Sequence, residues 1–304
     1  MIGKSGDHLR LRAKGKAGET MRIVDAHQHL LIGKEHEASY DPELLMNSGV
    51  VNQSWLLSAN GFTGGHATDE EVLALCRRHP DAFLPFGYLD FRKGPQRIEY
   101  LRGAGCVGLK AIWPEEPYDA KRYFPLYECA EALRMPILFH VGGAYYEPPC
   151  RPRTADSSVL SPEQLYGRNM MPIHMDAIAK SFPKLVIIMA HLGGDAAHFQ
   201  EAALVCNGHA GMKGRAMMYL DLSSELSYYG LPSLVKAKEV IDYVGPGRIL
   251  YGSDAYYPYA VEVARFWLFF LQKVMRMREQ DVARIMGGNA DEIVREAMPS
   301  RGGQ

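Results

Sequence analysis

Short apolar runs rich in β-branched and aromatic residues recur along the chain, and amphipathic segments lie between them. Eight such runs occur, at residues 22–30, 50–58, 83–90, 107–114, 136–143, 184–194, 218–225 and 248–258. Helix start and stop signals mark the intervening segments 68–80, 122–136, 172–183, 195–206 and 232–245. In the first of these segments, Thr68 and Glu71 have capping-box spacing and Pro80 ends the helix. The pattern predicts strands that alternate with helices.

This alternation favours one fold class. Near-continuous apolar strands between amphipathic helices indicate a parallel sheet covered by helices. Eight βα units in about 250 residues fit a closed (β/α)8 TIM barrel better than an open doubly wound sheet. An open sheet usually has a glycine-rich GxGxxG loop after its first strand, and no strand here is followed by one. We therefore expect an α/β fold, a single TIM-barrel domain over residues 21–304.

Two segments depart from the regular pattern. Residues 1–20 contain five basic side chains but lack the apolar core of a secretion signal, which predicts a flexible N-terminal extension and, less well, a transit peptide. Residues 144–171 form a proline-rich insert after the fifth predicted strand. Loops that follow strands lie over the catalytic face of a barrel, so this insert is a candidate lid.

Composition and charge limit the partners. The net charge of −1 and pI of about 6.8 give no electrostatic signature for nucleic acid or an anionic membrane, so the expected partner is a small-molecule substrate or a second copy in a homo-oligomer. The five cysteines are widely spaced without a CxxC pair, which argues against a disulfide framework and favours the cytoplasm. The most apolar helical stretch, 264–275, is shorter than the roughly 20 residues of a membrane span.

Two histidines, His27 and His29, end the first apolar run in the sequence DAHQH. Strict strand alternation places both on the side of Ile23 and Asp25, with Gln28 on the other side. A lone histidine at the end of a buried strand is more often a hydrogen-bonded core residue than a metal ligand. This pair alone leaves both interpretations open.

The same feature recurs at three other predicted strand ends. His140 ends the fifth run, His191 the sixth, and Asp254 the eighth. Strand ends meet in one pocket of a barrel, where each unpaired polar group would cost about 1–3 kcal/mol, so a shared cation would satisfy them together. Imidazole and carboxylate donors suit zinc, manganese or iron(II). A catalytic metal keeps one position open for water, so not all five side chains should be ligands.

The ordered set DAHQH, GLK, FHVGG, MPIHMDAIAKSFPKLVIIMAHLGG, YGSD and IMGGNA resembles the amidohydrolase superfamily over about residues 22–298. The closest resemblance is to its amidohydrolase-2 branch, which includes aminocarboxymuconate semialdehyde and resorcylate-type decarboxylases and lactonases. The resemblance implies one divalent metal ion, zinc first and manganese or iron next, held by His27, His29, His140 and Asp254. In this pattern Asp254 either binds the metal or takes the proton from its water, and His191 lies beside the metal and acts as acid/base or polarises the substrate.

Two further side chains have competing interpretations. In binuclear relatives a fourth-strand lysine is carboxylated and bridges two metals, which would place His140 and His191 on the second ion; Lys110 could otherwise snorkel or pair with a carboxylate. Asp25 could hydrogen-bond a ligand histidine or form an internal salt bridge. No catalytic role is expected for the remaining histidines, which are His8, His36, His66, His79, His174, His198 and His209.

Specificity should come from the loops after the strands. The candidate substrate contacts are Trp113, Tyr145, Tyr146, Arg151, Arg153, Tyr256 and Tyr257. Arginine can bind a carboxylate through two hydrogen bonds and aromatic rings can flank a planar group, so a small anionic or aromatic substrate is expected unless these arginines are only solvated. The preferred reaction is attack of metal-activated water on an ester, lactone or amide carbonyl. The alternatives are decarboxylation of an aromatic or muconate-type acid and, less favoured, a metal-free lactonase or a non-catalytic binding protein.

Overall fold

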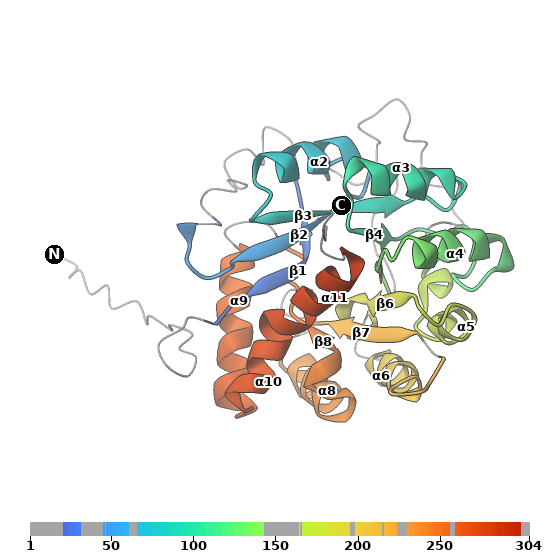
Figure 1. The fold of residues 1–304 in the computed structure, drawn as a ribbon. Helices are drawn as coiled ribbons and strands as arrows, with labels where there is room; N and C mark the ends of the chain where they lie inside the picture. Colours follow the sequence, from blue (N-terminus) through green and yellow to red (C-terminus); the bar gives the residue numbers. More distant parts are fainter. Residues whose placement is uncertain are drawn as a thin grey trace.

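The computed structural model describes residues 21–31, 45, 47–60, 66–142, 164, 166–194, 198–214, 216–223, 230–255 and 259–298. Eight parallel strands follow one another in chain order around a sheet, and helices surround it (Figure 1). The strands are β1 (Val24–His29), β2 (Gln53–Leu57), β3 (Phe83–Leu89), β4 (Gly108–Ala111), β5 (Ile137–Phe139), β6 (Val186–Met189), β7 (Met217–Asp221) and β8 (Ile249–Leu250). Each overlaps one of the eight predicted runs, and the predicted TIM barrel is confirmed.

Contacts between β1 and the segment after β8 bring the two ends of the sheet together. Ala26 N donates to the carbonyl oxygen of Tyr251 at 2.9 Å, and Gln28 forms a parallel bridge with Ala255. Asp254 N donates to the carbonyl oxygen of His27 at 2.7 Å. These bonds place the end of the chain's last strand beside the first histidine of DAHQH.

The described α-helices are α2 (Asp69–Arg78), α3 (Gln96–Ala104), α4 (Phe124–Ala132), α5 (His174–Ser181), α6 (Phe199–Gly208), α8 (Gly230–Val244), α9 (Tyr259–Phe269), α10 (Glu279–Ala283) and α11 (Asn289–Ala297). Five of them, α2, α4, α5, α6 and α8, overlap the predicted helical segments, and α9 overlaps the apolar stretch 264–275. Helices α3, α10 and α11 were not predicted from the sequence. The capping box of α2 is present: Thr68 N donates to Glu71 Oε2 at 2.8 Å, and Glu71 N donates to Thr68 Oγ1 at 3.3 Å. Among the described residues, none of the helices combines the length and apolar character that crossing a membrane requires.

Two apolar layers follow from the alternation of side chains along the strands. The inner layer fills the barrel, where the rings of Trp55 and Phe86 stack with centroids 4.7 Å apart. The outer layer joins the other strand face to the helices. Helix α11 adds Ile293 to the inner layer, and its Asp291 pairs at 2.9 Å with Arg22, which precedes β1. Helix α11 therefore covers the N-terminal end of the barrel.

Strand β1 contains an irregularity that sequence alternation did not predict. The register with β2 shifts between Asp25 and Gln28, so a β-bulge lies just before His29. Val24 and Ala26 belong to the inner layer, whereas Ile23 belongs to the outer layer. The expectation that Ile23 and Asp25 share a face with the two histidines is therefore wrong, because a bulge re-aims the side chains that follow it.

The predicted insert is described only in its last part. Residues Gly167–Met170 form a short 3-10 helix after the described Gln164. Gln164 Nε2 donates to the carbonyl oxygen of Trp113 at 3.1 Å, and Asn169 Nδ2 donates to that of Pro114 at 3.2 Å. This part of the insert therefore packs on the loop that follows β4, at the C-terminal edge of the barrel. The N-terminal extension lies outside the described residues.

Candidate metal and catalytic site

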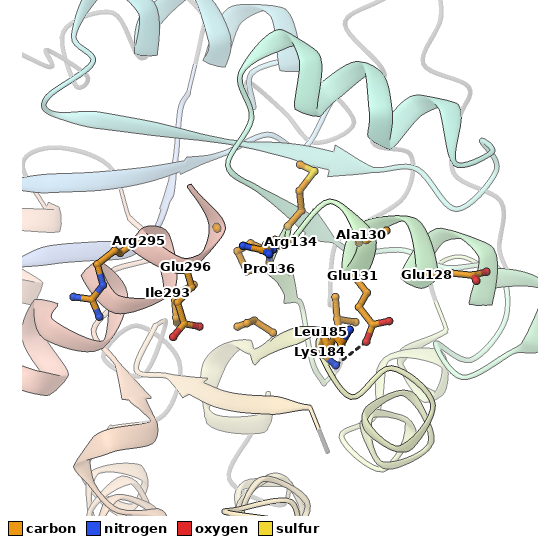
Figure 2. A pocket seen from close by; sticks show the side chains of 14 residues that line it. Glu128, Ala130, Glu131, Arg134, Pro136, Lys184, Leu185, Ile293, Arg295 and Glu296 are labelled. Atoms are coloured by element: carbon orange, nitrogen blue, oxygen red, sulfur yellow. Dashed lines mark hydrogen bonds between the residues drawn. The ribbon is translucent and has the colours of Figure 1, made fainter. Parts of the chain in front are cut away.

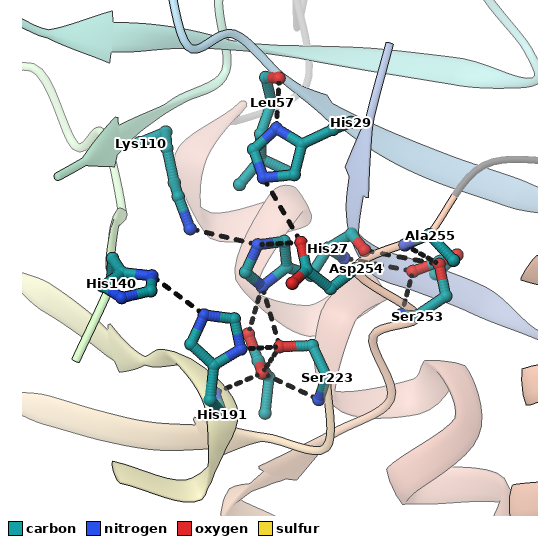
Figure 3. A network of polar contacts seen from close by, with 12 residues as sticks. His27, His29, Leu57, Lys110, His140, His191, Ser223, Ser253, Asp254 and Ala255 are labelled. Carbon is teal, nitrogen blue, oxygen red and sulfur yellow. Dashed lines mark hydrogen bonds and ion pairs between the residues drawn. The ribbon is translucent and has the colours of Figure 1, made fainter. Parts of the chain in front are cut away.

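Ionisable side chains from five strands converge at the C-terminal edge of the barrel (Figure 3). They are His27, His29, Lys110, His140, His191 and Asp254. Lys110 lies within β4, His140 directly follows β5, and His191 lies two residues beyond β6. The structure thus brings together all the ligand and acid/base candidates that the sequence proposed.

Two of these residues have left-handed backbone conformations. His191 has a φ of 58° and Asp254 a φ of 49°, which is uncommon for residues other than glycine and costs about 1–3 kcal/mol each. Hydrogen bonds from the backbone N–H groups stabilise these conformations. His191 N donates to Asp221 Oδ1 at 2.9 Å, and Asp254 N donates to the carbonyl oxygen of His27. The fold therefore turns both side chains away from the strand direction and into the site.

Hydrogen-bond partners identify which nitrogen carries the proton in the first two histidines. His29 Nδ1 lies 3.1 Å from the carbonyl oxygen of Leu57, which can only accept, so Nδ1 carries the proton and Nε2 holds a lone pair. His27 Nδ1 lies 2.9 Å from Asp221 Oδ2, with the same consequence. Burial lowers the pKa of His29 to about 3 and that of His27 well below its usual value, so both rings are neutral at pH 7.

Asp254 adds a third acceptor to these two nitrogens. Asp254 Oδ1 lies 3.4 Å from both His27 Nε2 and His29 Nε2. Lys110 Nζ donates to His27 Nε2 at 3.0 Å, but His29 Nε2 and Asp254 Oδ1 still face each other as two acceptors. Facing lone pairs in a partly buried site are unfavourable unless a cation lies between them. This donor set fits a divalent metal ion.

The most compact metal-binding group differs from the predicted ligand set. Among the described residues, His27, His191 and Asp254 each offer a ligand atom, and these atoms lie within 4.8 Å of one another. His140 reaches the group through His191, since its Nδ1 lies 3.0 Å from His191 Nε2. Proximity therefore favours His191 as a ligand. With His140 Nδ1 as the donor, the hydrogen bond favours His140 instead, because it occupies the lone pair of His191 Nε2 and leaves the lone pair of His140 on Nε2.

The contacts of Lys110 and Asp25 bear on the competing interpretations that were given for these two residues. Lys110 is 1% exposed and contacts His27 Nε2, so it does not snorkel to solvent; burial lowers its pKa to about 8. Asp25 Oδ1 accepts from the backbone N–H groups of Ser253, at 2.9 Å, and His27, at 3.2 Å. Asp25 thus binds the backbone of His27 rather than its ring, and no ion pair of Asp25 occurs among the described residues. Burial raises its pKa to about 7.

Three site residues were not predicted from the sequence. Asp221 and Ser223, at the end of β7, contact both His27 and His191. Applying the strand-end rule to the carboxylate in MYLDLSS would have identified Asp221. His66, for which no role was expected, has its ring centroid 4.9 Å from that of His29, because an antiparallel bridge to Leu31 brings it over β1.

A small cavity opens onto this cluster. Its lining consists of His29, Ala59, His66, Lys110, Ile112, Trp113, His140, His191 and Asp254. Trp113 therefore lies where a substrate contact was predicted. The other candidate contacts, Tyr145, Tyr146, Arg151, Arg153, Tyr256 and Tyr257, lie outside the described residues.

His174 and His209 pair elsewhere, with Asp119 at 3.0 Å and Asp176 at 2.9 Å.

A second, larger cavity lies at the other end of the barrel (Figure 2). It is bounded by α4, by the residues leading into β5 and β6, and by α11. Its lining has mixed charges, including Glu131, Glu296, Arg134 and Lys184, and the described residues that line it include no histidine, cysteine or serine. Active sites of TIM barrels lie at the C-terminal face, so the histidine cluster is the candidate site.

Comparison with known proteins identifies the family. The sequence profile of the amidohydrolase family matches residues 24–295, and the chain belongs to this family, as the resemblance predicted. Among curated proteins, no sequence matches the chain significantly.

Three solved structures illustrate the shared fold. An uncharacterized TIM-barrel protein from Bordetella bronchiseptica has 17% identity and a TM-score of 0.68, covering 91% of this chain and 99% of its own. A probable 2-pyrone-4,6-dicarboxylic acid hydrolase from Acinetobacter baumannii has 11% identity and a TM-score of 0.60, covering 90% and 99%. A dihydroxybenzoic acid decarboxylase from a Polaromonas species, with bound manganese and 2-nitroresorcinol, has 16% identity and a TM-score of 0.58, covering 90% and 97%.

Proposed function

We propose that this protein is a metal-dependent hydrolase that cleaves an ester, lactone or amide bond in a small anionic or aromatic molecule. The observation that carries the proposal is the opposition of His29 Nε2 and Asp254 Oδ1 beside His27, at the catalytic edge of an amidohydrolase barrel. A neighbour of the same fold named as a probable pyrone dicarboxylic acid hydrolase supports the reaction type and an anionic substrate. The proposed compartment is the cytoplasm, since the four described cysteines are free.

The proposed ligands are His27, His29, His140 and Asp254, with zinc as the first choice of metal and manganese or iron as the others. A divalent ion held there supplies Lewis acidity and, for zinc, lowers the pKa of water to about 7. His191 is the proposed acid/base: burial lowers its pKa well below the usual value, so the neutral ring can accept a proton and pass it to the leaving group.

Asp254 has a second proposed role besides binding the metal. Its side chain is 22% exposed while the neighbouring His27 is fully buried, so the carboxylate lies at the opening of the site. From there it can take the proton of an attacking water. Trp113 lines the same cavity and would flank the substrate.

Decarboxylation of an aromatic or muconate-type acid is the second candidate. It is favoured by the fold neighbour that is named as a dihydroxybenzoic acid decarboxylase and has manganese bound. A divalent ion held by the same residues would bind the substrate carboxylate. His191 or Asp254 in its protonated form would protonate the adjacent carbon, and the carbon–carbon bond would break to release carbon dioxide.

Metal analysis and product analysis together test these proposals. Protein purified without chelator should contain about one equivalent of zinc, manganese or iron. Chelation should abolish activity, and metal should restore it. In 18O-labelled water, hydrolysis places the label in the carboxylic acid that forms from the cleaved ester or amide. Decarboxylation releases carbon dioxide, and no cleaved ester or amide takes up the label. Metal content well under one equivalent, with no activity restored by added metal, would contradict the metalloenzyme.

A pair of variants tests the ligand assignment. His140→Ala should lose the metal, whereas His191→Ala should keep it and lose turnover. The opposite result, with metal lost only in His191→Ala, would support the compact group of His27, His191 and Asp254 as the ligands.

A further inference from the structure

The side chain of Ser223 lies at the centre of a polar network behind the candidate metal ligands (Figure 3). Its Oγ lies 3.0 Å from His27 Nδ1 and 2.8 Å from His191 Nδ1. It also contacts Asp221 Oδ1, while Asp221 Oδ2 lies 2.9 Å from His27 Nδ1. Ser223 and Asp221 are both fully buried, so water does not compete for these bonds. One hydroxyl therefore joins two histidines and a carboxylate.

Counting protons in this network assigns every bond a direction. Asp221 Oδ1 already accepts from the backbone N–H groups of His191, at 2.9 Å, and Ser223, at 3.0 Å, and it also accepts the single hydroxyl proton of Ser223. The Ser223 oxygen then has only lone pairs left, and a hydroxyl oxygen has two. It accepts from His191 Nδ1, and it shares the Nδ1 proton of His27 with Asp221 Oδ2. The Nδ1 atoms of His27 and His191 therefore both carry the ring proton.

Contacts on the opposite side of the rings require the same tautomer for His27 and are compatible with it for His191. Lys110 Nζ lies 3.0 Å from His27 Nε2, and an ammonium group can only donate. His140 Nδ1 lies 3.0 Å from His191 Nε2, so once His191 carries its proton on Nδ1, His140 Nδ1 is the donor of this bond. Lys110 thus independently leaves the Nε2 lone pair of His27 directed into the site, and the Ser223 network does so for His191.

We propose that Asp221 and Ser223 are positioning residues that set the tautomers of His27 and His191 together, so that both rings present an Nε2 lone pair to the metal site. The shared hydroxyl makes the two rings dependent on each other: if His191 turned to the other tautomer, its Nδ1 lone pair would oppose the Ser223 oxygen that also holds His27. The side chain of Ser223 thereby orients both His27, a proposed metal ligand, and His191, the proposed acid/base. The metal-affinity consequence rests on the proposed function, whereas the tautomers can be observed without metal.

The tautomers can be read directly by NMR. In metal-free protein with 15N-labelled histidine, long-range 1H–15N spectra distinguish Nδ1–H from Nε2–H rings, with the signals assigned through His27→Gln and His191→Gln. We expect both rings of the wild type to be Nδ1–H. Ser223→Ala should give a mixed population for His191, and Asp221→Asn should shift His27 toward Nε2–H, because the new amide can donate to Nδ1.

Metal affinity is the second measurement. Loss of a group that orients a ligand histidine typically lowers metal affinity about 10- to 100-fold, so titration with zinc and with manganese should show such a loss in Ser223→Ala and Asp221→Asn. Ser223→Thr keeps the hydroxyl and should restore both the Nδ1–H signals and the affinity. Ser54→Ala removes an equally buried serine hydroxyl, in β2, and should change neither.

The possible results separate this inference from the proposed function. Wild-type tautomers and wild-type metal affinity in both Ser223→Ala and Asp221→Asn would overturn the inference, as would Nε2–H rings in the wild type. If the wild type binds no metal but shows Nδ1–H rings that depend on Ser223, the metalloenzyme fails and the tautomer assignment stands. Circular dichroism of each variant identifies any that does not fold. If Asp221→Asn does not fold, the comparison of Ser223→Ala with Ser223→Thr decides.

Discussion

The two ends of this barrel differ in the kind of side chain that they bury. At the C-terminal end, Lys110 is 1% exposed and His27 is fully buried, each next to other ionisable groups. At the N-terminal end, Ala290 and Ile293 of α11 continue the apolar interior, and the charged side chains line an open cavity instead (Figure 2). Burying ionisable groups costs free energy, so their concentration at one end identifies it as the candidate site, and the other end is expected mainly to contribute stability.

Strand β1 contributes residues to both the apolar interior and the polar cluster within a few positions. Val24 and Ala26 belong to the apolar interior, and His27 and His29 belong to the polar cluster. The β-bulge between Asp25 and Gln28 makes this change possible, because it shifts which residues face inward. Asp25 fastens the bulge to the chain after β8 through Ser253 N. The boundary between the two ends is thus set by local backbone geometry.

Removal of a histidine from the polar end should have the largest effect. His27→Ala deletes a proposed ligand that contacts Asp221, Lys110 and Asp254. Metal affinity should fall by more than the 10- to 100-fold that is typical when only a group supporting a ligand is lost, and turnover should fall to background. Isothermal titration with zinc, together with metal analysis of the purified protein, measures the loss.

A second buried histidine provides the matched control. His209 is 4% exposed and pairs with Asp176 on α5, away from the polar cluster. His209→Ala should reduce stability without changing metal affinity. Equal metal affinity in His27→Ala and the wild type would show that the polar end does not bind metal through this strand.

Much of the fold could be predicted because its signal is local. Eight apolar runs gave eight strands, and the capping box at Thr68 and Glu71 gave the start of α2. The convergence of His27, His140, His191 and Asp254 also followed, since the C-terminal ends of parallel barrel strands meet at one face.

What could not be predicted depends on contacts between distant residues. The bulge in β1 is a property of its pairing with β2, so alternation alone placed Asp25 on the wrong face. His66 enters the site only because the loop after β2 pairs with Leu31. The role of Ser223 depends on two rings from β1 and the β6 loop meeting its hydroxyl, which no sequence spacing records.

An apolar truncation at the other end should give the second largest effect, and on stability only. Ile293 of α11 is 2% exposed within the inner layer, so Ile293→Ala should lower the free energy of unfolding by about 2–5 kcal/mol. Urea denaturation measures this change. Metal affinity of the folded protein should stay at the wild-type value, and a loss comparable to that of His27→Ala would mean that the two ends are coupled.

The smallest effect should be a change in how stability depends on pH, caused by the buried lysine of the polar end. Burial lowers the pKa of Lys110 to about 8 in the folded protein, below its ordinary value of 10.5. Between these values the unfolded chain binds more protons than the folded one, so this group makes the free energy of unfolding rise as pH increases from about 8 to about 10.5. In metal-free Lys110→Met this contribution disappears. Urea denaturation at several pH values should therefore show wild type gaining stability relative to Lys110→Met across that window, whereas Lys184→Met, at an exposed lysine of the opposite end, should give a curve parallel to wild type. Parallel curves for wild type and Lys110→Met would mean that the Lys110 ammonium is not destabilised by burial, and the electrostatic contrast between the two ends would not hold at this residue.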